Sequence, residues 1–197
     1  INCVSLGIFS WSSYEPRENE YHFEWLQQVM DNLYANGIYT ILATPSGAKP
    51  AWLDKNYPDC LRVDNMGVRY HHGDRHNYCM SSENFRSKLK KINTMLAEKF
   101  SHHPALLMWH ISNEMGGECF CPECIAKFQE WLKAKYHNDI NELNHAWWTT
   151  FWSHKFSCFE EIEPPFYNGE TSILGLNLDW KRFTSWNMAD CMKSEIE

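Results

Sequence analysis

The chain has 197 residues, 44% of them hydrophobic and 15% aromatic, which is typical of a globular protein and excludes disordered and collagen-like classes. Eighteen basic and twenty-five acidic residues give a formal net charge of -7 without a stripe of Lys or Arg, so we expect neither nucleic acid nor an anionic membrane as a partner. No apolar stretch approaches the length of a membrane span and the first residues carry no basic leader, so we expect a soluble, cytoplasmic protein.

The first predicted unit is a strand followed by a helix. Cys3 to Phe9 is a short apolar run that is long enough for a strand. Apolar residues then recur at helical spacing up to Gly37, which suits the left-handed end of a helix; they are Phe23, Leu26, Val29, Met30 and Leu33.

A second strand is predicted over Ile38 to Thr44, ending before Pro45. About forty residues without a clear period follow, and a loop of that length in a compact domain is usually functional. An amphipathic helix comes next, with Ser81 or Ser82 as its N-cap. Its apolar face consists of Phe85, Leu89, Ile92, Leu96 and Phe100.

A third strand is predicted over Ala105 to Ile111, and its apolar and aromatic residues favour a strand covered on both faces. Glu114 then stands at the carboxyl end of this strand, where barrels of alternating strands and helices carry their active sites. Glu114 is therefore a candidate acid or base, with Asn113 beside it to hydrogen-bond a substrate. The alternative is a solvated loop carboxylate.

Three cysteines follow within six residues, at Cys119, Cys121 and Cys124. They are too closely spaced for ordinary disulfides and indicate metal binding in a reducing compartment. Three thiols can converge on one tetrahedral ion but leave one position empty, so a fourth ligand must come from elsewhere. We expect the remaining cysteines to be buried or free thiols: Cys3, Cys60, Cys158 and Cys191.

The last third of the chain contains two further predicted helices. One follows the cysteines, with apolar residues at Ile125, Phe128, Leu132 and Tyr136. Asp139 to Glu170 is expected to be irregular and aromatic, and Leu176 to Glu197 to be helical.

Alternating strands and helices predict parallel βα units, in a doubly wound sheet or a (β/α)8 barrel. Neither G-x-G-x-x-G nor G-K-[ST] occurs in the sequence. A complete barrel needs eight strands and about 250 residues, and only three clear strands are predicted here, so we expect a segment of a larger protein.

Several runs closely resemble the β-galactosidases of glycoside hydrolase family 42. They are FSWSSYEPRENEYHFEWL (Phe9 to Leu26), ILATPSGAKPAWL (Ile41 to Leu53), RHNYC (Arg75 to Cys79), SNEMGG (Ser112 to Gly117), CFCPEC (Cys119 to Cys124) and LNHAWWTTFWS (Leu143 to Ser153). The resemblance implies a partial TIM barrel, roughly strands 2 to 4, with residues 1–197 in the N-terminal half of the catalytic domain. It also implies retaining hydrolysis with two Glu residues, Glu114 being the acid/base.

The resemblance assigns further roles around Glu114. Arg75 would bind substrate, Asn113 would contact the 2-hydroxyl of the sugar, and Trp152 best matches an aromatic wall. The substrate would be a galactoside or oligosaccharide, and the parent protein can be expected to form a homotrimer.

Many members of the family bind a structural zinc through four cysteines, and Cys79 matches the upstream ligand. Four thiolates leave no open position, so the zinc would brace the loop that carries Glu114 and would not touch the sugar. The alternative is four reduced cysteines without a metal. His71, His72 and His76 lack H-E-x-x-H spacing and are interpreted as polar loop residues near the substrate.

The family's nucleophilic Glu lies on a strand beyond this chain, so the 197 residues alone are expected to be inactive. Two alternatives stay open for the parent protein. One is a retaining glycosidase of other sugar specificity, and the other is a zinc-stabilised carbohydrate-binding protein that does not hydrolyse its ligand.

Overall fold

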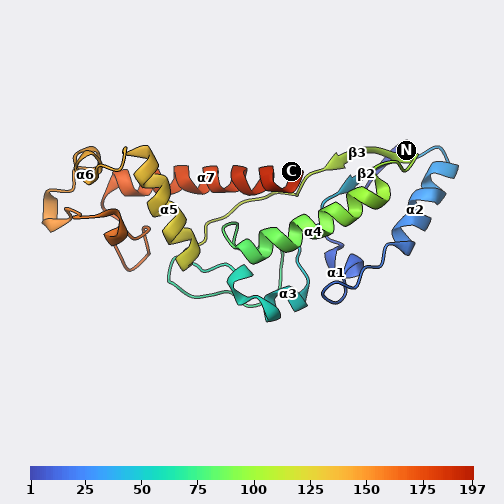
Figure 1. Ribbon diagram of the computed structural model, residues 1–197, viewed down its shortest axis with the longest axis horizontal. Coiled ribbons are helices and arrows are strands. Elements are labelled where there is room, and N and C mark those ends of the chain that lie inside the picture. Colours follow the sequence, from blue (N-terminus) through green and yellow to red (C-terminus); the bar gives the residue numbers. More distant parts are fainter.

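Three parallel strands form the sheet of the protein, which is described over residues 1–197 by a computed structural model (Figure 1). The strands are β1 (Cys3–Leu6), β2 (Tyr39–Ala43) and β3 (Leu106–His110), in the order β1-β2-β3. Helix α2 (Glu24–Ala35) connects the first pair, and the crossover to β3 includes α4 (Glu83–Phe100). The parallel βα units predicted from the sequence are confirmed, and they form part of a (β/α)8 barrel.

Further helices follow or interrupt these units. They are α1 (Trp11–Tyr14), α3 (Ala51–Asn56), α5 (Pro122–Lys135), α6 (Ile140–Trp147) and α7 (Leu174–Ile196), with short 3-10 turns at Pro58–Cys60, Phe151–Ser153 and Phe159–Glu161. None of the helices combines the length and the apolar character needed to cross a membrane.

The long helices follow from their apolar periodicity and their caps. The Ser82 side chain accepts a hydrogen bond from the Phe85 N–H at 3.1 Å, so Ser82 is the N-cap of α4, as predicted. All five apolar positions expected on the inner face of α4 are buried. Gly37 follows α2 with φ of +71°, which confirms the predicted helix stop.

The prediction that the third strand is covered on both faces is wrong for this chain. Leu107 and Met108 are each about half exposed, at 52% and 53%. Thr40 pairs with Leu106 and Ile41 with Met108, so Leu107 is an extra residue that disturbs the usual alternation of faces. β3 is also an edge strand here, because the sheet ends at it.

Three short helices, α1, α3 and α6, were not predicted. α3 lies inside the segment expected to be an irregular loop, and its six residues are too few to show a period. α6 lies inside the segment expected to be irregular and aromatic. The side chain of Asp139 caps α6 by accepting the Asn141 N–H at 2.8 Å, and Asp139 with Glu142 three residues later was the local signal for this helix.

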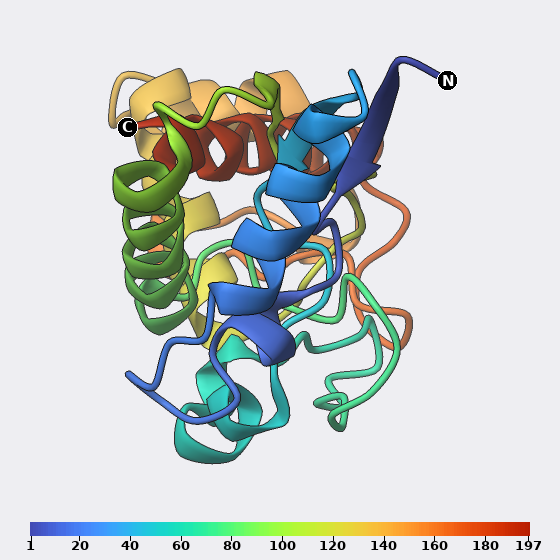
Figure 2. The same cartoon turned by 90° about the vertical axis from the view of Figure 1, so that its right-hand side faces the viewer.

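The hydrophobic interior consists of two clusters. The sheet-side core packs α1, α2 and α4 against the strands, and its largest buried side chains include Trp11, Tyr14, Phe85 and Phe100. The cysteine-side core packs α5, α6 and α7 together, and includes Phe128, Trp180 and Phe183. In Figure 2, α2 and α4 stand side by side with β1 next to α2. Figure 1 shows α7 running from the cysteine side toward the end of β3, so this helix belongs to both parts.

Candidate active site and metal centre

The carboxyl ends of the three parallel strands lie at one edge of the sheet, and the segments that leave them carry the candidate residues. Phe9 follows β1, Gly47 follows β2, and Glu114 follows β3. The loop after β2 returns to this edge, because the His76 N–H donates to the Gly47 carbonyl at 3.0 Å. The edge therefore gathers side chains from three different βα connections.

Arg75 and Glu114 form an ion pair at this edge. Nη1 of Arg75 lies 2.6 Å from Oε2 of Glu114, and the two side chains are 48% and 64% exposed. The guanidinium carbon of Arg75 also lies 5.8 Å from the centre of the Phe9 ring. An ion pair this exposed contributes little stability, so the geometry favours a carboxylate that is oriented and open to a ligand. Sequence reasoning missed Phe9 as a neighbour of Arg75, because the first strand was predicted to extend to Phe9, whereas β1 ends at Leu6 and leaves Phe9 in the connection that follows.

The backbone around Glu114 is unusual. Ser112 has φ of +56° and Glu114 has φ of +47°, the left-handed region that residues with a side chain rarely adopt. Asn113 lies between them and is half-buried. Such conformations persist where the surroundings impose them, and they are frequent at functional sites.

The turn is held on its far side by Arg62. Nη2 of Arg62 donates to the Gly116 carbonyl at 2.7 Å. Gly117 follows with φ of +87°, and a Cβ there would lie 1.9 Å from Nη1 of Arg62. Only glycine allows the backbone to pass so close to the guanidinium group.

The four predicted cysteines converge. The sulfur atoms of Cys79, Cys119, Cys121 and Cys124 all lie within 4.8 Å of one another, and all four residues are buried. Sγ of Cys79 lies 3.4 Å from Sγ of Cys121 and 3.5 Å from Sγ of Cys124. Corners of a tetrahedron with metal–sulfur bonds of about 2.3 Å would be about 3.8 Å apart, so the cluster can hold a metal ion.

The surroundings of the cluster favour the charged form of one sulfur above all, that of Cys119. The Val63 N–H donates to Sγ of Cys119 at 3.4 Å. Hydrogen bonds from Cys121, Cys124 and Cys79, and this N–H, hold the pKa of Cys119 far below its ordinary value. The pKa of Cys124 is raised instead, chiefly by its hydrogen bond to Cys119. A cation is what would allow all four sulfurs to be thiolates together.

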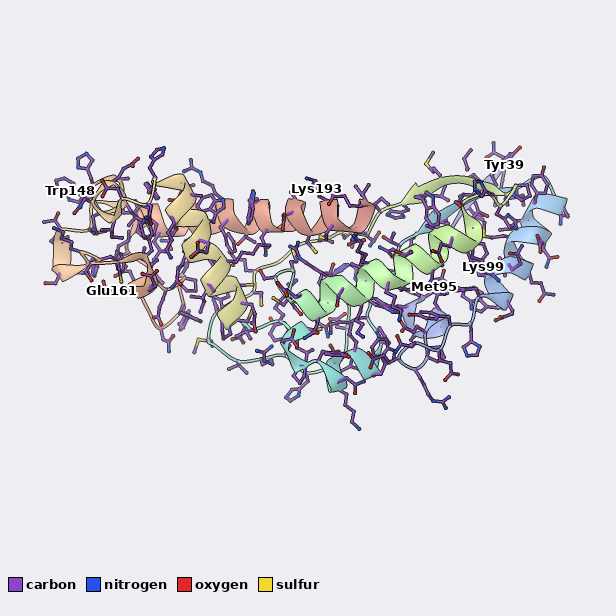
Figure 3. All side chains as sticks on the ribbon, in the orientation of Figure 1. Tyr39, Met95, Lys99, Trp148, Glu161 and Lys193 are labelled. Atoms are coloured by element: carbon purple, nitrogen blue, oxygen red, sulfur yellow. The ribbon has the colours of Figure 1, made fainter.

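Trp152 is not brought to the Arg75–Glu114 pair in this chain. It is 71% exposed and lines a hollow with Trp148, Phe151 and Leu174. In Figure 3, Trp148 lies at one end of the long axis and Tyr39, the first residue of β2, lies near the other. Trp152 and Arg75 line different hollows, and no residue is shared between the two.

The three loop histidines share a hollow with Arg75. Nδ1 of His72 lies 2.6 Å from Oδ2 of Asp54, whose other oxygen pairs with the buried Lys49. His72 is therefore oriented by a carboxylate and contacts no second histidine as a co-ligand. This arrangement fits the prediction of polar loop residues better than a second metal site.

Comparison with known proteins places these features in a wider group. A family model described as Beta-galactosidase, glycoside hydrolase family 42, matches residues 1–197. The chain is 52% identical over 195 residues to β-galactosidase GanA of Bacillus subtilis, covering 99% of this chain and 29% of that protein. It is 54% identical over 196 residues to β-galactosidase BglY of Alicyclobacillus acidocaldarius, covering 100% of this chain and 28% of that protein.

A solved structure is also very similar. The chain superimposes with a TM-score of 0.98 at 52% identity on a catalytic mutant of Gan42B, a GH42 β-galactosidase from G. stearothermophilus. The match covers 99% of this chain and 28% of that one. The chain therefore spans less than a third of the length of these relatives.

Proposed function

The chain belongs to glycoside hydrolase family 42, the β-galactosidases, and from this premise we propose that its parent protein releases terminal β-D-galactose from β-galactosides with retention of configuration. The observation that carries the proposal is the position of Glu114. It lies at the carboxyl edge of a parallel sheet, exposed and paired with Arg75 at 2.6 Å. Glu114 is the general acid/base of this reaction.

The carboxyl group of Glu114 has two successive tasks. It first protonates the oxygen of the leaving group while a nucleophile attacks the sugar, and it then removes a proton from the water that cleaves the glycosyl-enzyme. An exposed carboxylate at the carboxyl edge of the sheet can reach both the leaving group and the incoming water. Arg75 binds a sugar hydroxyl and keeps the carboxylate oriented between these steps.

Two other residues complete the proposed sugar site. Asn113 precedes Glu114 on the same turn and hydrogen-bonds the 2-hydroxyl of galactose. Trp152 forms part of the aromatic wall, and its exposed ring offers a flat apolar face to a sugar. Since Trp152 lies away from the Arg75–Glu114 pair in this chain, its role depends on the assembled parent protein, for which we propose a homotrimer.

The second carboxylate of the reaction comes from a part of the parent protein outside these residues. Retaining hydrolysis needs two carboxyl groups about 5 to 5.5 Å apart. Residues 1–197 supply one half of that pair as a partial barrel domain, and we expect them to be inactive alone.

The four cysteines would hold a structural zinc ion. Their sulfurs are buried and mutually close, and sulfur ligands without an open position favour a closed, non-catalytic zinc site. The ion would brace the segment between Glu114 and α5. Thiolates of this kind persist in a reducing compartment, which supports a cytoplasmic location.

The test is Glu114→Ala in the full-length protein. We expect hydrolysis of lactose to be nearly abolished, whereas a dinitrophenyl galactoside should still form the glycosyl-enzyme because its leaving group needs little protonation. Azide should then accelerate the slow second step and yield β-galactosyl azide, because azide attacks without a general base. The matched control is Glu118→Ala, since Glu118 is an exposed carboxylate four residues away.

If Glu114→Ala hydrolysed both substrates at the wild-type rate, Glu114 would be a solvated loop residue. Failure of the full-length protein to hydrolyse any β-galactoside would favour the alternative of a carbohydrate-binding protein. Hydrolysis of arabinosides, fucosides or glucosides in preference to galactosides would change the sugar specificity but keep the mechanism.

A further inference from the structure

Helix α7 ends with a buried carboxyl group that no part of the proposed mechanism uses. Glu195 is only 7% exposed, and no Lys, Arg or His pairs with it. Its Oε2 accepts hydrogen bonds from Oγ1 of Thr44 at 2.9 Å and from Oγ of Ser46 at 3.1 Å. Thr44 and Ser46 follow β2, at the same edge of the sheet as Glu114. Figure 3 shows Lys193, two residues before Glu195, where α7 approaches the end of β3.

The two hydroxyl groups connect Glu195 to the turn after β3. The Ser112 N–H donates to Oγ1 of Thr44 at 2.7 Å. Oγ of Ser112 lies 3.0 Å from Oγ of Ser46. A hydroxyl group has one proton, so if Ser46 donates to Glu195, Ser112 must donate to Ser46. The Ser112 N–H is therefore linked through the Thr44 hydroxyl to Oε2 of Glu195. The Ser112 hydroxyl is linked to the same oxygen through the Ser46 hydroxyl.

This network holds the strained part of the candidate site. Ser112 is 1% exposed and has φ of +56°, and Glu114 two residues later has φ of +47°. Such conformations are unfavourable for residues with a side chain and persist only where the surroundings impose them. Arg62 holds the other side of the turn through the Gly116 carbonyl. Between these two anchors, the direction of the Asn113 and Glu114 side chains is set.

We propose that Glu195 is a positioning residue, which holds the Ser112–Glu114 turn through Thr44 and Ser46 so that Glu114 can transfer its proton to the leaving group. The inference rests on the assignment of Glu114 as the acid/base. Glu195 does not touch the substrate in this proposal. It acts through Ser112. Thr44 and Ser46 each precede Glu195 by 149 or more residues along the chain, so only the fold brings these groups together.

The role requires an acceptor oxygen and does not require a charge. Burial raises the pKa of Glu195 to about 7, and the hydrogen bonds from Thr44 and Ser46 offset part of that rise. The second oxygen, Oε1, is buried without a hydrogen-bonding partner, and it can carry the proton while Oε2 keeps both hydrogen bonds. An amide oxygen can accept the same two bonds, so Glu195→Gln is a conservative replacement.

The experiment compares Glu195→Leu, Glu195→Gln and wild type in the full-length enzyme. The kcat/KM value is measured for phenyl galactoside, which needs protonation, and for dinitrophenyl galactoside, which needs little. We expect Glu195→Leu to lower kcat/KM for phenyl galactoside about 10- to 100-fold, the range that misplacing a catalytic group can cost, and the dinitrophenyl value far less. Glu195→Gln should recover most of the lost rate.

A purely structural role predicts a different result. If Glu195 only stabilises the fold, Glu195→Leu lowers the amount of active enzyme and both substrates lose rate by the same factor. An unchanged ratio between the two substrates would therefore overturn the proposal. Should Glu195→Leu not fold, Thr44→Val takes its place, because it removes one hydroxyl at nearly constant volume, with Thr44→Ser as its rescue.

Glu114→Ala, measured with the same two substrates, separates this inference from the proposed function. If Glu114→Ala leaves the ratio unchanged, the acid/base assignment fails. If Glu114→Ala changes the ratio and neither Glu195→Leu nor Thr44→Val does, the positioning role alone fails. If the inference holds, Glu195→Leu added to Glu114→Ala should cause little further leaving-group-dependent loss.

Discussion

The sheet-side core and the cysteine-side core each contain 17 buried residues, so they differ in kind and not in size. The sheet-side core is built on strands whose backbone ladders join distant segments. The cysteine-side core contains no residue of β1, β2 or β3; it includes the four clustered cysteines and packed rings such as Phe128 and Trp180, at 5.0 Å between centroids. No backbone ladder joins the helices of this region, and the four cysteines lie where a metal ion could cross-link them.

The turn that carries Glu114 lies between these two regions and is anchored to both. On the sheet side, Ser112 is tied to Thr44 and through it to Glu195. On the other side, Arg62 holds the Gly116 carbonyl and Cys119 enters the thiol cluster. The comparison teaches that Glu114, the proposed acid/base, lies between two kinds of anchor, a hydrogen-bond network and a four-cysteine cluster. Each can be broken separately.

The largest expected effect is on the cysteine side. The full-length wild-type protein should contain close to one zinc per chain by elemental analysis. Cys121→Ser should lower the zinc content and the free energy of unfolding of this region by more than about 4 kcal/mol, because loss of a bound metal is among the most destabilising changes. Hydrogen exchange should accelerate in the Gly116–Lys135 segment while the sheet-side helix α2 stays protected.

Cys158→Ser is the control for that experiment, since Cys158 is a half-buried free thiol outside the cluster. It should leave both zinc content and exchange unchanged. Equal loss of protection in α2 and α5 would show that the two regions unfold as one unit. If wild-type protein prepared without chelator contained no zinc, the four cysteines would not be a zinc site.

An intermediate effect is expected on the sheet side and depends on pH. The pKa of Glu195 is raised by burial from 4.5 to about 7, so the folded state keeps a proton that the unfolded state releases between these values. The contribution of Glu195 to stability is therefore fully present below about pH 4.5 and lost as the pH rises to about 7. Glu195→Gln does not titrate, so relative to wild type it should gain about 2.5 kcal/mol between pH 5 and pH 8.

Thermal unfolding of the full-length protein at several pH values measures this difference. The melting temperature of Glu195→Gln minus that of wild type should increase through this window and then level off. A difference that stays constant with pH would mean that Glu195 ionises at its ordinary value, and that the buried network is open to water.

The smallest expected effect is at the N-terminus of α4, next to the cysteine cluster. Ser82→Ala removes the side-chain oxygen that accepts the Phe85 N–H, and should lower the free energy of unfolding by about 1 kcal/mol. Ser87→Ala, on the exposed face of the same helix, should change it by less than about 0.5 kcal/mol. A loss of zinc from Ser82→Ala, measured together with stability, would show that the cap also supports Cys79.

Local sequence patterns were sufficient for much of this fold. Short apolar runs predicted all three strands. Apolar residues at helical spacing predicted the helices α2, α4, α5 and α7, because a long helix repeats its buried face over several turns. The position of Glu114 after a predicted strand and the spacing of Cys119, Cys121 and Cys124 could likewise be recognised from short stretches of the sequence. Family resemblance added Cys79, and the structure brings its sulfur within 3.4 Å of Cys121.

Tertiary structure alone decided the rest. The helices α3 and α6 are too short to show an apolar period, and their formation depends on tertiary packing. The exposure of Leu107 and Met108 follows from a bulge at the edge of the sheet. The pairing of Arg75 with Glu114 and the hydrogen bonds from Thr44 and Ser46 to Glu195 join residues far apart in the chain. Hydrophobic periodicity reports the face that a segment buries, whereas such polar contacts depend on how separate elements meet, and a sequence pattern carries no record of that geometry.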